Sequence, residues 1–79
     1  MSKEYYKKRL VDLRASIARE REAKKRDNAR YAQKIKSASS PSQKTNYRKS
    51  KISASAAHDS RIESLKREVE RTRDYIRRS

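Results

Sequence analysis

The sequence predicts an all-α protein: an antiparallel hairpin of two long helices, a coiled coil that folds back at its midpoint. Three observations lead to this prediction. The chain contains no Gly and one Pro, whereas Ala, Lys, Arg and Glu, all strong helix formers, are abundant. Small hydroxyl residues cluster at the midpoint of the chain. An apolar stripe with coiled-coil spacing lies on each side of that cluster.

The composition of the 79-residue chain argues against a rounded globular core. Hydrophobic residues make up 32% and charged residues 43%, and there is no Phe or Trp. A chain this short buries only about 60% of its unfolded surface even when it is well packed. Low hydrophobicity with high net charge is also typical of disorder, but disordered linkers are usually rich in Gly and Pro. Long helices, which need only a narrow apolar seam, are therefore the favoured structure.

The turn and the adjacent helix ends follow from residues 37–43. Ser40 suits an N-cap, and Pro41 suits the first helical position because its missing N–H has no partner there. Gln43, three residues after Ser40, completes a capping box. We expect one module over 1–79, with a first helix over about 3–36, a turn over 37–40 and a second helix over about 41–78.

Apolar residues recur at spacings of three and four along both helices, as they do at the core positions of coiled coils. If the chain folds at Ser39 and Ser40, residues whose numbers add up to about 79 come opposite one another. Ile17 then faces Ile62, and the two stripes meet although each lies far from the turn. The expected helix–helix seam consists of Tyr6, Leu10, Leu13, Ile17, Ile62, Leu65, Val69 and Ile76.

The middle of the seam is polar, because Glu20, Lys24 and Asp27 come opposite His58 and a stretch of small residues. Small side chains bury little area, so a lone hairpin is expected to be marginal. We expect a homo-oligomer or a protein partner to complete it as a larger helical bundle. A weaker second stripe on the first helix suits such a contact, and helix propensity explains it equally well. This stripe consists of Val11, Ala15, Ala18, Ala29 and Ala32.

No catalytic chemistry is expected, and the protein is predicted not to be an enzyme. The chain has no Cys and a single His, so no second such ligand exists to complete a metal site. His58 is interpreted as a packed seam residue. Without Gly, no phosphate-binding loop of P-loop or Rossmann type can form. We therefore expect no catalytic residue, no metal, no cofactor and no small-molecule substrate.

The formal net charge of +14 makes the surface basic along the whole chain. Residues 1–39 carry 13 basic and 5 acidic side chains, and residues 40–79 carry 11 and 5. Such charge density attracts polyanions through counterion release, but it is also typical of a solvated coiled-coil exterior. The clusters surround both helices, and no recognised nucleic-acid-binding motif is present. The candidate polyanion contacts are Lys7, Lys8, Arg9, Lys24, Lys25, Arg26, Arg48 and Lys49.

The leading interpretation is a non-catalytic helical module that self-associates or scaffolds a protein partner. The alternative is a small basic protein that binds nucleic acid through nonspecific phosphate contacts. No apolar run is long enough for a signal peptide or a membrane span, so a cytoplasmic location without a membrane partner is expected.

The segment Ser37-Ala38-Ser39-Ser40-Pro41-Ser42-Gln43-Lys44, followed by Tyr47 and Lys51-Ile52, lies between two charged helices. In this respect the chain resembles the N-terminal helical region that precedes the TIR domain in some bacterial TIR-domain proteins. There, a turn rich in Ser or Thr joins two helices rich in Lys and Glu. The resemblance implies a bacterial coiled-coil region that promotes self-association. This chain is more basic than that pattern and contains no TIR domain, so nucleotide cleavage is not implied for it.

Overall fold

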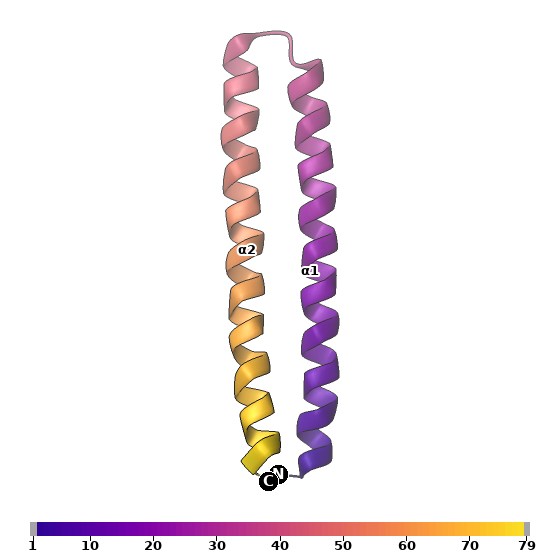
Figure 1. Ribbon diagram of the computed structural model, residues 1–79. Helices are drawn as coiled ribbons and strands as arrows, with labels where there is room; N and C mark the ends of the chain where they lie inside the picture. The colour runs from indigo at the N-terminus through magenta and orange to yellow at the C-terminus, as the bar shows by residue number, and fades with distance from the viewer. Residues whose placement is uncertain (1, 79) are drawn as a thin grey trace.

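Two antiparallel helices of similar length lie side by side in the computed structural model, which describes residues 2–78 (Figure 1). Helix α1 spans Lys3–Ser37 and helix α2 spans Pro41–Arg78, so the predicted all-α hairpin is confirmed. The Cα trace measures 59 × 14 × 13 Å, the shape of a straight rod. The described chain ends lie together at one end of the rod, and the turn lies at the other (Figure 1). Neither helix has a stretch, within residues 2–78, that is long and apolar enough to cross a membrane.

Serine hydroxyls form hydrogen bonds with the backbone at both ends of α1. At the N-terminus the Tyr5 N–H donates to Ser2 Oγ over 3.3 Å, which satisfies one N–H that has no partner within the helix. At the C-terminus the Ser37 hydroxyl donates to the Gln33 carbonyl over 2.9 Å. Helix α1 therefore reaches Ser37, one residue beyond the predicted end, and the turn is correspondingly shorter.

The N-terminus of α2 is capped by the residues expected from the sequence, with one difference. The Gln43 N–H donates to Ser40 Oγ over 3.2 Å, as in a capping box. The return contact goes one residue further back than expected, because Gln43 Oε1 accepts from both the N–H and the hydroxyl of Ser39, each at 3.1 Å. One amide oxygen thus receives two donors and ties the turn to the first turn of α2.

Replacing Ser40 with Ala is expected to destabilise the hairpin by about 1 kcal/mol, because the Gln43 N–H loses its acceptor. For a chain of this size, this corresponds to a fall of roughly 4–8 °C in the thermal midpoint measured by circular dichroism. Ser42→Ala is the matched control, since the Ser42 hydroxyl has no hydrogen-bond partner within residues 2–78. Equal losses in the two variants would show that capping is not the cause.

The core is a narrow line of side chains between the helices. Its buried hydrophobic residues, among those described, are Leu13, Ile17 and Ile62. Thr72 is less exposed than any of these, at 3%, and its hydroxyl donates to the Glu68 carbonyl over 2.8 Å. Thr72 continues the predicted spacing between Val69 and Ile76 and is part of the core, although it is not hydrophobic. The remaining predicted seam residues are half-buried: Tyr6, Leu10, Leu65, Val69 and Ile76.

Two ring contacts across the helices lie within about two residues of the predicted alignment. Tyr6 stacks on Tyr75 with ring centroids 4.9 Å apart, and Lys34 Nζ lies 5.7 Å from the centroid of Tyr47. In both contacts the residue numbers add up to 81, not to the expected 79. A helical side chain leans toward the N-terminus of its own helix and covers a spot about one residue before its Cα. In an antiparallel pair both displacements act in the same sense, which raises the sum by about two.

Candidate functional site

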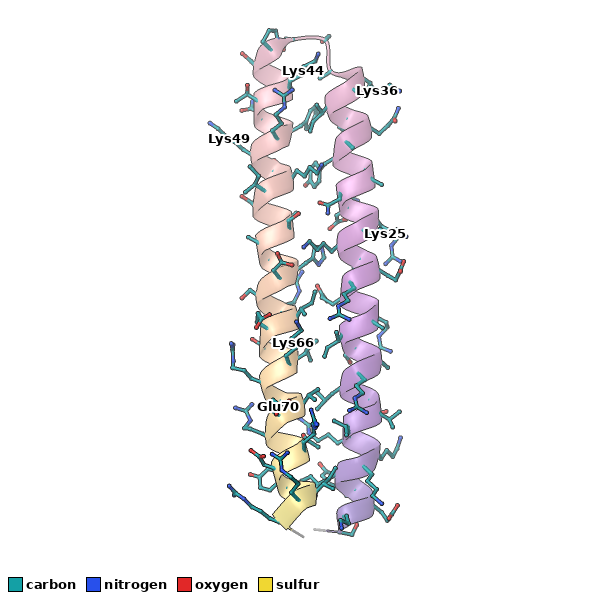
Figure 2. The ribbon with its side chains drawn as sticks, viewed as in Figure 1. Lys25, Lys36, Lys44, Lys49, Lys66 and Glu70 are labelled. Atoms are coloured by element: carbon teal, nitrogen blue, oxygen red, sulfur yellow. The ribbon has the colours of Figure 1, made fainter. Side chains whose placement is uncertain are left out.

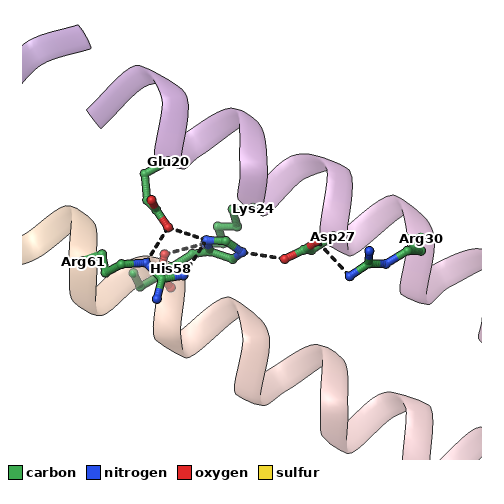
Figure 3. A network of polar contacts seen from close by, with 7 residues as sticks. Glu20, Lys24, Asp27, Arg30, His58 and Arg61 are labelled. Carbon is green, nitrogen blue, oxygen red and sulfur yellow. Dashed lines mark hydrogen bonds and ion pairs between the residues drawn. The ribbon is translucent and has the colours of Figure 1, made fainter. Parts of the chain in front are cut away.

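A polar centre lies midway along the seam, where His58 of α2 projects between two carboxylates of α1 (Figure 3). His58 Nδ1 lies 2.6 Å from Glu20 Oε1, and His58 Nε2 lies 2.6 Å from Asp27 Oδ2. Glu20 and Asp27 are seven residues apart, about two helical turns, so both occupy the same face of α1. With His58 only 7% exposed, this contact belongs to the helix–helix interface and not to the surface.

The geometry of the centre sets the protonation state of His58. An ionised carboxylate only accepts hydrogen bonds, so both ring nitrogens must donate, which requires the imidazolium form. The hydrogen bond to Asp27 and then that to Glu20 raise the pKa of His58 above its ordinary value of 6.5, against the opposing effect of desolvation. The imidazolium is therefore the form that this site stabilises.

The two carboxylates are also stabilised in their charged form. Hydrogen bonds from Arg61 and then His58 lower the pKa of Glu20, and the hydrogen bond from His58 lowers the pKa of Asp27. Arg61 Nε donates to Glu20 Oε1 over 2.7 Å, and Arg30 Nη2 donates to Asp27 Oδ1 over 3.1 Å. Arg61 Nη2 also lies 3.2 Å from His58 Nδ1, but a protonated Nδ1 cannot accept from it. Two carboxylates are thus balanced by three cations.

Two further contacts across the helices belong to this polar layer. Lys24 Nζ donates to Asp59 Oδ1 over 2.7 Å, and the Ser55 hydroxyl donates to Asn28 Oδ1 over 2.8 Å. Sliding one helix along the other would break these contacts and the His58 centre together. Polar layers in coiled coils fix the alignment of the helices in this way.

The hydrogen bonds of the polar centre join side chains of the two helices to one another. Both nitrogens of His58 are engaged, so neither is available to a substrate. No group of three or more His, Cys, Asp or Glu side chains within residues 2–78 is arranged to hold a metal ion. We conclude that the centre aligns the helices, and that interaction surfaces have to be sought elsewhere on the rod.

The eight predicted polyanion contacts are not gathered into one surface. Four of them contact neighbouring carboxylates at 2.5–3.7 Å: Lys7, Lys8, Arg9 and Lys24. The other four have no carboxylate partner among the described residues: Lys25, Arg26, Arg48 and Lys49. Figure 2 shows Lys25 on the outer side of α1 and Lys49 on the outer side of α2.

The hairpin does, however, separate charge along its length. Residues 28–58 surround the turn (Figure 1), and we call them the basic tip. The tip reaches further along α2 than along α1, so its end at His58 lies level with Glu20 of α1. Residues 28–58 include seven basic residues and no acidic one. All ten acidic residues lie in the rest of the rod, the open end, together with the remaining 17 basic residues. The open end therefore carries mixed charge, whereas the tip carries charge of one sign.

Most basic side chains of the tip are unpaired. Arg30 pairs with Asp27, and the Lys34 ammonium lies 5.6 Å from the ring centroid of Tyr31 and 5.7 Å from that of Tyr47. Lys34 is thus held between two rings, one from each helix, by cation–π contacts. The other five have no carboxylate partner among residues 2–78: Lys36, Lys44, Arg48, Lys49 and Lys51.

A shallow groove of about 750 Å³ runs between the helices from the basic tip to the polar layer, where Lys24 and Asp59 line it. Arg48 and Lys51 line its part at the tip, beside the aliphatic side chains of Ile35 and Ile52. Ile52 is 70% exposed. This part of the groove therefore combines two unpaired cations with an accessible apolar side chain.

Sequence reasoning placed His58 opposite Glu20 and Asp27 but did not foresee that one ring would bridge both. The available signal was the spacing of two carboxylates by seven residues on one helix face, opposite the only histidine. The basic tip was missed because charges were counted in residues 1–39 and 40–79. Each of these segments contains part of the tip and part of the open end, so its net charge averages the charges of the two regions.

No family model, curated protein or solved structure was found to match this chain. The resemblance to the helical region before TIR domains therefore stays a prediction from the turn residues. Function has to be inferred from the arrangement of the side chains themselves.

Proposed function

We propose that the chain is a non-catalytic helical module that self-associates. The observation that carries this proposal is the thinness of the core. Among the described residues only Leu13, Ile17 and Ile62 are buried hydrophobics, and no side chain is completely buried. Each ordered residue costs about 1–2 kcal/mol of backbone entropy, and so small a core offsets little of that cost. A second copy packed against the rod would add apolar burial where the hairpin alone has little.

The groove at the open end is a poor surface for a second copy. Ile17 and Val69 line it, so part of the core is open to solvent there. Its rim carries four cations and only one carboxylate, so two copies meeting there would bring like charges together. The rim residues are Arg14, Arg21, Lys66, Arg73 and Glu70.

The outer face of α1 suits self-association better. Val11 is 64% exposed, although it is a large aliphatic residue. The alanines that continue its stripe are exposed too, and their small side chains allow a second helix to approach closely: Ala15, Ala18, Ala29 and Ala32. Beside the stripe, Lys8 and Asp12 form an ion pair at 3.7 Å, so both signs of charge are present. A surface with both signs can complement itself across a two-fold axis.

Self-association is expected to make the thermal midpoint rise with protein concentration. Val11→Asp should abolish that rise and leave a monomer in sedimentation velocity, because it places a charge in the contact. Ile52→Asp is the matched control, since Ile52 is an equally exposed aliphatic residue at the tip. A monomer mass with full helicity at low micromolar concentration, independent of dilution, would refute the proposal. Equal effects of the two substitutions would refute the choice of surface.

A further inference from the structure

We infer that the basic tip is a surface for the phosphate backbone of duplex nucleic acid, contacted without regard to base sequence. Its chain segment of residues 28–58 has no carboxylate of its own. The carboxylates of Glu20 and Asp27 contact His58 at the far end of this segment, whereas Lys44, Arg48 and Lys51 lie nearer to the turn. This inference goes beyond self-association and involves a different part of the rod.

The first argument is the density of unpaired cations. Lys44, Arg48 and Lys51 are spaced by four and three residues, so they form one row along α2. The row is about 10 Å long at 1.5 Å per residue. One strand of a duplex carries a phosphate about every 3.4 Å along its axis, so the row matches about three successive phosphates. Binding would release the condensed counterions of those phosphates, which is the main source of nonspecific affinity.

The second argument concerns the faces on which the cations lie. Lys49 projects from the outer side of α2, while Lys36 and Lys44 lie close to the turn (Figure 2). A duplex would contact the row on α2, and the cations on the other sides of the rod would add long-range attraction. An anionic membrane is a weaker fit, because Ile52 is the one large hydrophobic residue of the tip among those with marked exposure.

The third argument explains why base sequence should not matter. The major groove of B-DNA is about 12 Å wide and admits one helix, whereas the tip presents two helices side by side. Base edges are therefore out of reach, and contacts are limited to phosphates. Stacking on unpaired bases is not favoured either, because Tyr31 and Tyr47 are half-buried and both contact Lys34. We expect duplexes of different sequence to bind alike.

The test compares two variants of equal net charge by fluorescence anisotropy with a short duplex DNA over a salt series. The tip variant changes four cations to Gln: Lys44, Arg48, Lys49 and Lys51. The control changes four exposed open-end cations to Gln, none of which has a carboxylate partner within residues 2–78: Lys3, Arg14, Arg21 and Arg78. Circular dichroism establishes that both variants keep the helical content of the parent chain.

At low salt the tip variant should bind roughly 100-fold or more weakly than the parent, and the slope of log K against log salt should be shallower by about three to four. The control should keep the parent slope and lose less than roughly tenfold in affinity. Equal losses in both variants would overturn the inference, because they would show that net charge acts without a site. Absence of binding by the parent at low salt would also overturn it.

Two further probes test whether the tip binds other polyanions more tightly than duplex DNA. Poly-glutamate represents acidic protein segments, and vesicles containing phosphatidylserine represent an anionic membrane. Tip-dependent binding that is tighter to either probe than to duplex DNA would overturn the assignment to nucleic acid. The dilution behaviour of the tip variant in sedimentation velocity should match that of the parent. A failure of DNA binding can therefore be told apart from a failure of self-association.

Discussion

Leu13→Asp is expected to unfold the hairpin. Leu13 is 7% exposed and lies in the small buried part of the core. The substitution removes a large apolar side chain, which in a core costs about 2–5 kcal/mol, and adds a charge that has to be desolvated. The total stability of a small domain is about 5–15 kcal/mol, and this hairpin belongs at or below the lower limit. Helical content measured by circular dichroism should fall toward that of an unfolded chain.

Ile52→Asp is the matched control for this prediction, because it introduces the same charge at an aliphatic residue that is 70% exposed. It should leave the thermal midpoint nearly unchanged. Leu65→Asp should lower the thermal midpoint more than Ile52→Asp but less than Leu13→Asp, since Leu65 is only half-buried. If Leu13→Asp melts like the parent chain, the seam described here is wrong.

The second large effect expected is a loss of stability when the pH rises through the folded pKa of His58. Because the pKa of His58 is raised in the fold, its stabilising contribution is fully present below the unfolded value of 6.5 and is lost as the pH rises through the folded value. The pKa values of Glu20 and Asp27 are lowered, so their contribution is present above 4.5 and 3.8 and is lost as the pH falls through the folded values. Stability should therefore be greatest between pH 4.5 and 6.5.

His58→Gln isolates the histidine, because Gln is neutral at every pH and can still donate to one carboxylate. The variant should melt several degrees below the parent in mildly acidic solution, since both carboxylates lose the imidazolium and Gln replaces only one of its two hydrogen bonds. The difference between the two thermal midpoints should shrink as the pH rises through the folded pKa of His58. A difference that stays constant from mildly acid to mildly alkaline pH would show that His58 is not held as the imidazolium.

The sequence was sufficient for the fold because its local signals agree with one another. The absence of Gly favours long helices, and the Ser40-Pro41 pair marks the start of the second one. The spacing of apolar residues then identifies the faces that meet. The same spacing predicted the alignment only to within two residues, because periodicity locates Cα positions and not the tips of side chains that lean along the helix.

The candidate surfaces were harder to predict, because they depend on how the two helices are brought together. The bridge from His58 to both carboxylates requires a particular offset between α1 and α2 that composition does not contain. The separation of charge into tip and open end appears only once residue 28 is known to lie level with Ser55. Linear clusters such as Lys7-Lys8-Arg9 are evident in the sequence, yet Arg9 forms an ion pair with Glu68 of the other helix.

The location of both described chain ends at the same end of the rod has a mechanical consequence (Figure 1). A pulling force applied to these ends would peel the helices apart one layer at a time, since the load falls on the outermost contact first. The Tyr6–Tyr75 stack would open before the aliphatic layers, the His58 centre after them, and the Lys34–Tyr47 contact last. The force needed to separate the helices would therefore be set by the strongest single layer and not by the sum of all layers. A rod loaded by shear, with its ends pulled from opposite extremes, would have to break all of its layers together.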